Sequence, residues 1–128
     1  MKFLSFVRAG RAGFGAVLDN GVVDLSARHA DMPDLRAAIR AAALPALANE
    51  ALRIGADFSL AEARYLPTIP NPEKIICIGV NYENRNAEYQ DGSDAPSYPS
   101  VFMRSRESLV GHHEAIYDPP ESEQLDYE

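Results

Sequence analysis

The run Lys74-Ile75-Ile76-Cys77-Ile78-Gly79-Val80-Asn81-Tyr82 decides the fold class of this chain. Its uninterrupted apolar centre is typical of a short strand that is buried on both faces, so we expect such a strand over residues 74–80. Polar residues then dominate from 83 to 98. A rigid strand that ends in a polar loop can fix the first side chains of a site, while the loop closes over a ligand. On these residues alone, an ordinary surface loop remains the stronger interpretation.

The sequence on either side of this run indicates the domain organisation. A second strand is expected over residues 100–104, where Val101, Phe102 and Met103 are consecutive apolar residues. Before the run, three prolines in the eight residues 65–72 predict a stiff, extended connector. We therefore predict a small N-terminal domain over residues 1–66, a connector over 67–72 and a second domain over 73–128. The second part has 56 residues (128 − 72), too few to close a sizeable core around a doubly buried strand. The chain is therefore expected to be the N-terminal piece of a larger fold.

The first domain is predicted to combine a small sheet with two short helices. Apolar runs on both sides of Asn20-Gly21, a strong hairpin signal, predict an antiparallel sheet over residues 2–25. Good helix formers predict a helix over 33–44, for which Asp31 is placed as the cap, and a second helix over 46–54. Both helices look like packing elements, and the fold class is α+β, mostly β.

Composition excludes several classes of function. Of the 128 residues, 46% are apolar and 24% are charged, which is typical of soluble globular proteins. No apolar run approaches the ~20 residues of a membrane span, and the N-terminus lacks a signal peptide, so we expect neither a membrane partner nor export. The single cysteine, Cys77, excludes an internal disulfide and is expected to be an inert core residue, and the chain is expected in a reducing cytoplasm.

Charge is concentrated at the C-terminus. The chain has a net charge of −7, and its last fifteen residues contain six acids and no base; without them the balance is 12 − 13 = −1. A duplex nucleic acid needs a basic surface, so it is not expected as a partner. A solvated acidic tail is the simpler interpretation of the cluster. The alternative is a site for a hard divalent cation, since Asp126 and Glu128 would share one face of a strand over 124–128.

The three histidines are weaker candidates for metal ligands or site residues than the C-terminal acids. His112 and His113 are possible metal ligands by residue type, but adjacent positions on a strand point to opposite faces, so both would rarely bind one ion. One of them could sit at the mouth of a site, although a structural role is favoured for both. His29 is expected in a loop.

Three blocks, taken together, resemble a known family. Pro70–Tyr82, Pro99–Arg104 and Pro119–Glu128 are similar, in order and spacing, to segments of the fumarylacetoacetate hydrolase superfamily. The chain as a whole resembles the N-terminal portion of a bacterial member of the kind that isomerises 2-hydroxyhepta-2,4-diene-1,7-dioate. The resemblance implies a mixed β-roll catalytic domain, of which residues 73–128 would be the beginning, preceded by a small variable domain.

The resemblance also implies an activity and a cofactor. Members act on small oxo-acids in the catabolism of aromatic compounds, by C–C bond hydrolysis of acylpyruvates and β-diketo acids or by isomerisation or decarboxylation of 2-hydroxy-dienedioates. They are usually homodimers and bind Mg²⁺ or Mn²⁺, with Ca²⁺ as a further candidate, through a Glu-x-Glu pair and a later acid. Glu128 would be the first ligand of that pair, so most ligands would lie beyond the chain, which by itself is expected to be inactive.

Residue by residue, the resemblance assigns a site. Asn81 and Tyr82 would line the substrate, and Arg104 would bind it where the family usually has the lysine of Phe-x-Lys. Hydrolytic members carry a histidine three residues after Asn-Tyr and a glutamate three residues later; here these positions are Arg85 and Glu88. Arginine does not lose its proton at neutral pH, so Arg85 would hold a substrate carboxylate, and Glu88 would be catalytic.

The alternative from another class is a catalytically incompetent chain, an assembly module that binds a protein partner.

Overall fold

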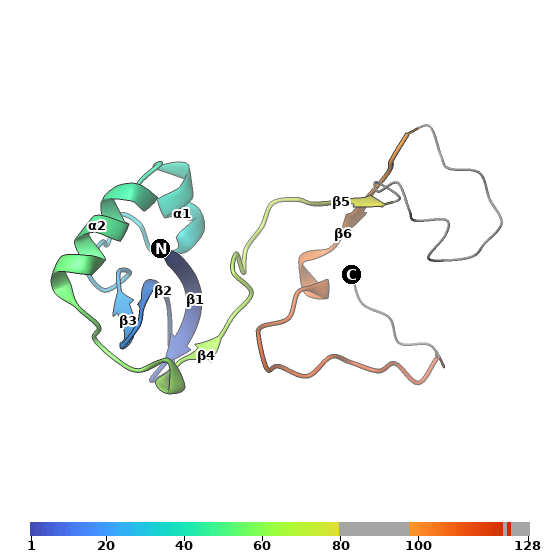
Figure 1. Cartoon of the computed structure of the whole chain (residues 1–128). Helices are drawn as coiled ribbons and strands as arrows, with labels where there is room; N and C mark the ends of the chain where they lie inside the picture. The colour runs from blue at the N-terminus through green and yellow to red at the C-terminus, as the bar shows by residue number, and fades with distance from the viewer. Residues whose placement is uncertain (80–97, 122, 124–128) are drawn as a thin grey trace. The chain divides into compact units, whose positions relative to one another are not determined.

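The computed structural model describes residues 1–79, 98–121 and 123 (Figure 1). These residues divide between two compact units, one within Met1–Pro70 and Leu109–Glu128 and the other within Asn71–Ser108. The division of the chain into domains at residues 67–72 stays a prediction.

The first unit is built on a four-stranded antiparallel sheet with the order β3-β2-β1-β4. Its strands are β1 (Lys2–Arg8), β2 (Arg11–Leu18), β3 (Gly21–Asp24) and β4 (Arg64–Tyr65). The predicted sheet over residues 2–25 is confirmed, with one correction: Leu18 pairs with Gly21, so the turn is Asp19-Asn20 and not Asn20-Gly21. The short strand β4 was not predicted from the sequence, because two residues carry no periodicity.

Helix α1 spans Leu35–Arg40, shorter than the predicted 33–44. Its cap is Asp34, whose side chain accepts a hydrogen bond from the Ala37 amide at 2.7 Å, so the assignment of the cap to Asp31 was wrong. Pro33 stands before this cap rather than inside the helix. The helix ends early because Ala42 adopts a positive φ of 52°.

Helix α2 spans Leu44–Ile54 and ends at Gly55, as predicted, but begins two residues before the expected 46. Pro45 lies in its first turn, where a missing amide hydrogen costs no helical hydrogen bond. Among the described residues, no helix is long and apolar enough to cross a membrane.

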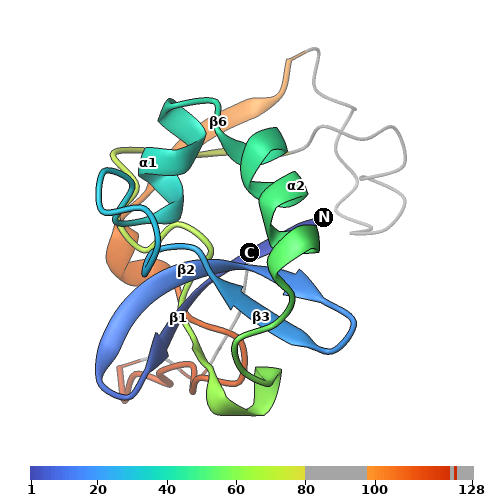
Figure 2. The same cartoon turned by 90° about the vertical axis from the view of Figure 1, so that its left-hand side faces the viewer.

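Both faces of the sheet are packed. Helices α1 and α2 cover one face (Figure 2), and the buried residues between sheet and helices include Phe14, Leu25 and Leu47. On the other face, Phe6 packs edge-on against Phe58, with ring centroids 5.1 Å apart. This core is what fixes the position of the segments around β4, because β4 pairs with the well-packed strand β1.

Among the described residues of the second unit, β5 (Ile75–Gly79) and β6 (Ser100–Arg104) form one antiparallel pair. The two predicted strands are confirmed, but the expected burial of the first on both faces is wrong for the described residues. Ile76 and Ile78 are 60% and 58% exposed, and their cross-strand partners Met103 and Val101 are similarly exposed. The cause is that β5 has one neighbouring strand in the described structure, and alternate side chains point to opposite faces.

An ion pair ties the loop after β3 to the segment after α2. Arg28 donates two hydrogen bonds to the Asp57 carboxylate, both at 2.7 Å, and the Asp24 amide donates a third at 2.8 Å. These hydrogen bonds, from Arg28 above all, lower the pKa of Asp57 below its ordinary value, and the same contact raises the pKa of Arg28. The carboxylate form of Asp57 is therefore linked to the folded state.

Substituting Asp57 should change how stability depends on pH. Because its folded pKa is lowered, Asp57 stabilises the fold above its unfolded pKa of about 3.9, and this contribution is lost as pH falls through the folded value. We expect Asp57→Asn to lower the free energy of unfolding by about 1–2 kcal/mol at pH 7, with a smaller loss at pH 3. Urea unfolding at both pH values measures this. Asp31→Asn, at an exposed position, serves as control, and an equal effect of the two variants at pH 7 would contradict the assignment.

Candidate functional site

The end of β5 is where the predicted site begins. Gly79 pairs with Ser100, so the chain leaves β5 and returns to β6 at the same end of the pair. The predicted residues Asn81, Tyr82, Arg85 and Glu88 fall between these two strands, outside the described residues, as does Glu128. The polar segment 83–98, which could close over a ligand as a lid, also lies outside them, except for the exposed Tyr98. The roles of all these residues stay predictions.

Arg104 is the one predicted site residue that the structure describes. It pairs with Ile75, at the opposite end of the hairpin from Gly79. Three residues of strand separate it from Ser100, and the four steps of rise correspond to roughly 13 Å along β6. The side chain is exposed, and its guanidinium carbon lies 5.3 Å from the centroid of the Phe102 ring. The Phe102 ring therefore stabilises the position of the Arg104 guanidinium. The role of Arg104 in binding substrate stays a prediction.

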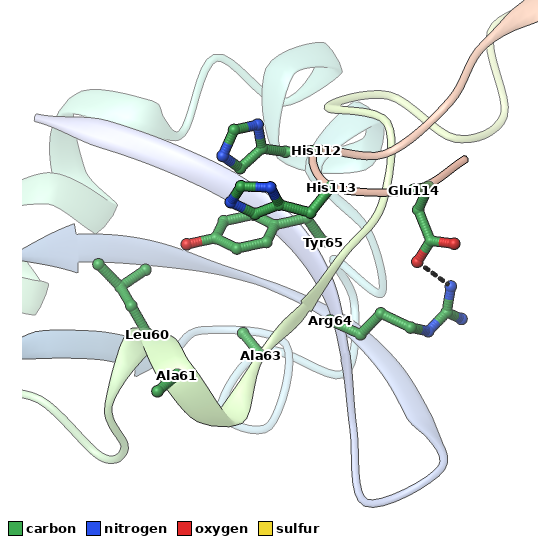
Figure 3. A pocket seen from close by; sticks show the side chains of 8 residues that line it. All are labelled: Leu60, Ala61, Ala63, Arg64, Tyr65, His112, His113 and Glu114. Carbon is green, nitrogen blue, oxygen red and sulfur yellow. Dashed lines mark hydrogen bonds and ion pairs between the residues drawn. The ribbon is translucent and has the colours of Figure 1, made fainter. Parts of the chain in front are cut away.

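A hollow of about 440 Å³ lies in the first unit (Figure 3). One wall is the short helix η1 (Leu60–Glu62) with Ala63, the floor is β4, and the other wall is the turn at residues 111–114. Eight residues line it: Leu60, Ala61, Ala63, Arg64, Tyr65, His112, His113 and Glu114. Sequence reasoning missed this site, because its two halves are about fifty residues apart and no spacing links them.

The turn is held against β4 by three contacts. Gly111 is buried, and a Cβ atom at this position would overlap the backbone carbonyl of Tyr65, so only glycine allows the approach. Arg64 donates to the Glu114 carboxylate at 3.0 Å, as the dashed line in Figure 3 marks. His112 packs edge-on against the Tyr65 ring, with centroids 5.4 Å apart. The hollow is therefore fixed by the backbone as well as by side chains.

The two histidines of the turn lie together rather than on opposite sides. Their ring centroids are 3.8 Å apart. The strand alternation expected from the sequence does not apply, because residues 112 and 113 form a turn in which His113 has a φ of 66°. Within residues 1–79, 98–121 and 123, no group of three or more His, Cys, Asp or Glu side chains could hold a metal ion. The pair is thus a polar feature of the hollow and not a described metal centre.

His29 and Cys77, the other two residues considered from the sequence, lie in structural rather than site positions. His29, in the expected loop, lies 3.0 Å from the Glu50 carboxylate through Nε2 and so joins the loop to α2. Cys77 is half-buried on β5, less enclosed than the expected core position. Neither residue lines the hollow.

Comparisons with known proteins match both parts of the chain. Residues 74–128 match the family described as Fumarylacetoacetate (FAA) hydrolase C-terminal. Over 73 residues the chain is 40% identical to oxaloacetate tautomerase YisK of Bacillus subtilis, covering 56% of this chain and 24% of that protein. Over 119 residues it is 28% identical to the mitochondrial oxaloacetate tautomerase Fahd2a of Rattus norvegicus, covering 91% of this chain and 37% of that protein.

A solved structure shares the fold. The crystal structure of a Mycobacterium smegmatis protein named HpcE aligns with a TM-score of 0.62 and 22% identity, over 91% of this chain and 40% of that one. At this identity the likeness concerns the fold alone. The chain spans between about a quarter and two-fifths of the length of these three proteins.

Proposed function

We propose that the chain belongs to the fumarylacetoacetate hydrolase superfamily, whose C-terminal family model matches residues 74–128, and that the protein carrying it interconverts the enol and keto forms of a small oxo-acid of the oxaloacetate class. The superfamily comprises isomerases and hydrolases of small oxo-acids. The observation that carries the proposal is the 40% identity with an oxaloacetate tautomerase over a segment longer than half of the chain.

The residue at position 85 favours isomerisation over hydrolysis. Hydrolysis of a C–C bond consumes a water molecule, which a general base must activate. Arg85 occupies the position where hydrolytic members of the family carry histidine, and a guanidinium keeps its proton at neutral pH. Isomerisation consumes no water, because the enol and the keto form contain the same atoms. Arg85 is suited to binding a carboxylate bidentately.

The proposed reaction consists of two proton transfers, one from the substrate to Glu88 and one from Glu88 back to the substrate. Arg85 and Arg104 anchor the substrate carboxylates, while Asn81 and Tyr82 line the site. The Glu88 carboxylate accepts the proton of the enol hydroxyl, the C2–O bond becomes a carbonyl, and C3 takes up a proton from the Glu88 carboxylic acid. Glu88 ends in the state in which it began, so the step balances.

A divalent ion, Mg²⁺ or Mn²⁺ with Ca²⁺ as a further candidate, is proposed as cofactor, with Glu128 as its first ligand. The described residues contain no group of three or more His, Cys, Asp or Glu side chains that could hold such an ion. A homodimer, a cytoplasmic location and a β-roll completed by further polypeptide are likewise proposed. The 128-residue chain alone is expected to be inactive.

Enol-to-keto conversion of oxaloacetate by the full-length protein tests the proposal, followed by the decay of the enol's ultraviolet absorbance with Mg²⁺ present. We expect a rate well above the buffer rate, and Arg85→Lys should raise KM about tenfold to a hundredfold, since an ammonium cannot reproduce the planar fork. Lys74→Arg, at an exposed position before β5, is the control. A buffer-level rate alongside rapid cleavage of an acylpyruvate would show a hydrolase instead.

A further inference from the structure

The hollow beside β4 has the features of a ligand site that the proposed reaction does not use. We propose that it binds a small carboxylate with a flat apolar body, such as an aromatic acid. Its volume of about 440 Å³ lies within the roughly 300–1,000 Å³ of small-molecule sites. Such sites combine apolar walls with a few convergent polar groups, and this hollow has both.

The charge of the lining favours an anion. The one carboxylate of the lining, Glu114, is paired with Arg64 at 3.0 Å, so these two charges offset each other. Glu62 of the neighbouring helix η1 is held by Arg8 at 2.9 Å and by the Ser59 amide at 3.0 Å. What remains is the pair of imidazoles, which contribute neutral or positive charge but never negative charge.

The ring nitrogens of His112 and His113 can form hydrogen bonds with a ligand. The ring of His112 contacts the rings of His113 and Tyr65, and no hydrogen bond from the described part of the chain reaches the nitrogens of either histidine. Each imidazole carries at least one N–H donor. Two adjacent donors match the two oxygens of one carboxylate, and charge-assisted hydrogen bonds of this kind are the strong ones.

The other wall fits an apolar body. Leu60, Ala61 and Ala63 face the histidines across the hollow (Figure 3), and the small alanine side chains leave room between the walls. The Tyr65 ring stands at 88° to the His112 ring, so the floor offers an aromatic surface. A flat ring can pack on such surfaces with an offset or edge-on geometry.

The site is also formed in advance. Gly111 seats the turn directly on the backbone of β4, and helix η1 is closed by reciprocal hydrogen bonds between Ser59 and Glu62. Binding therefore needs little ordering of the walls, which favours affinity for a small ligand.

Benzoate is the probe, titrated into the full-length protein at pH 7 and followed by NMR of the histidine and tyrosine rings. We expect saturable shifts at His112, His113 and Tyr65 with a dissociation constant in the millimolar range, about 4 kcal/mol of binding free energy at 1 mM. The double variant His112→Phe, His113→Phe keeps two rings but loses the N–H donors, and should bind about tenfold more weakly or worse. His29→Gln, outside the hollow, should bind as the wild type does, and a dispersed amide spectrum checks that each variant is folded.

Three results would overturn the proposal. Benzamide, which lacks the charge, could bind as tightly as benzoate, which would show an apolar hollow without carboxylate recognition. The ring signals could fail to saturate, or the double variant could keep the wild-type affinity, which would show that no site exists or that it lies elsewhere.

Discussion

Replacing Glu88 by glutamine is expected to lower kcat for oxaloacetate isomerisation by about 10²–10⁴-fold, the usual contribution of a positioned acid–base group. The amide has nearly the same shape but can neither accept the enol proton nor supply one to C3. KM should change little, because in the proposed site the two arginines, and not Glu88, hold the substrate carboxylates. Steady-state kinetics of the full-length protein measure both constants.

Glu83→Gln is the matched control for this experiment, since it makes the same chemical change in the same polar segment. It should retain kcat within a few-fold. If Glu88→Gln and Glu83→Gln both keep the wild-type kcat, Glu88 moves no proton and the proposed steps are wrong. If both lose activity equally, the segment needs its charge as a whole and no single base is identified.

Glu128→Gln should have the second large effect, a loss of turnover on the order of a hundredfold or more at millimolar Mg²⁺. A hard divalent cation binds charged oxygen ligands, and the amide keeps the shape of the side chain without its charge. Calorimetric titration with Mg²⁺ should show weaker binding even where no substrate is present, which separates a ligand from a residue needed only for catalysis.

Glu123→Gln, at an exposed position five residues earlier, is its control and should bind Mg²⁺ as the wild type does. Wild-type activity with unchanged metal dependence in Glu128→Gln would remove Glu128 from the ligand set. Circular dichroism of both variants checks that the fold is retained.

The local features of the first unit could be predicted from its sequence because they depend on neighbouring residues. The strands on both sides of Asp19-Asn20 follow from residue propensity, although the turn lies one residue earlier than the Asn20-Gly21 signal predicted. The end of α2 at Gly55 follows from the preference of helix ends for glycine. The helix cap was misplaced by three residues, because Asp31 and Asp34 are chemically identical and only the path of the chain past Pro33 distinguishes them.

Features that depend on distant contacts could not be predicted in the same way. The apolar run of β5 reads as doubly buried, yet Ile76 and Ile78 are exposed, since burial depends on what covers the strand. The hollow beside β4 depends on a turn that packs on a strand about fifty residues earlier. The two histidine rings lie together in the hollow because His113 has a positive φ, and no pattern in the sequence predicts this backbone conformation.

We propose that the protein delivers a proton to C3 of an oxo-acid enol, and the stereochemistry of that delivery is the most direct test. Enol oxaloacetate would be converted by the full-length protein in D₂O and trapped at once by enzymatic reduction to malate. NMR of the malate then reports which C3 position carries deuterium. An enzyme-bound acid can reach one face of the enol only, so the account predicts deuterium at a single C3 position. Equal labelling of both positions, as in the reaction without protein, would contradict it.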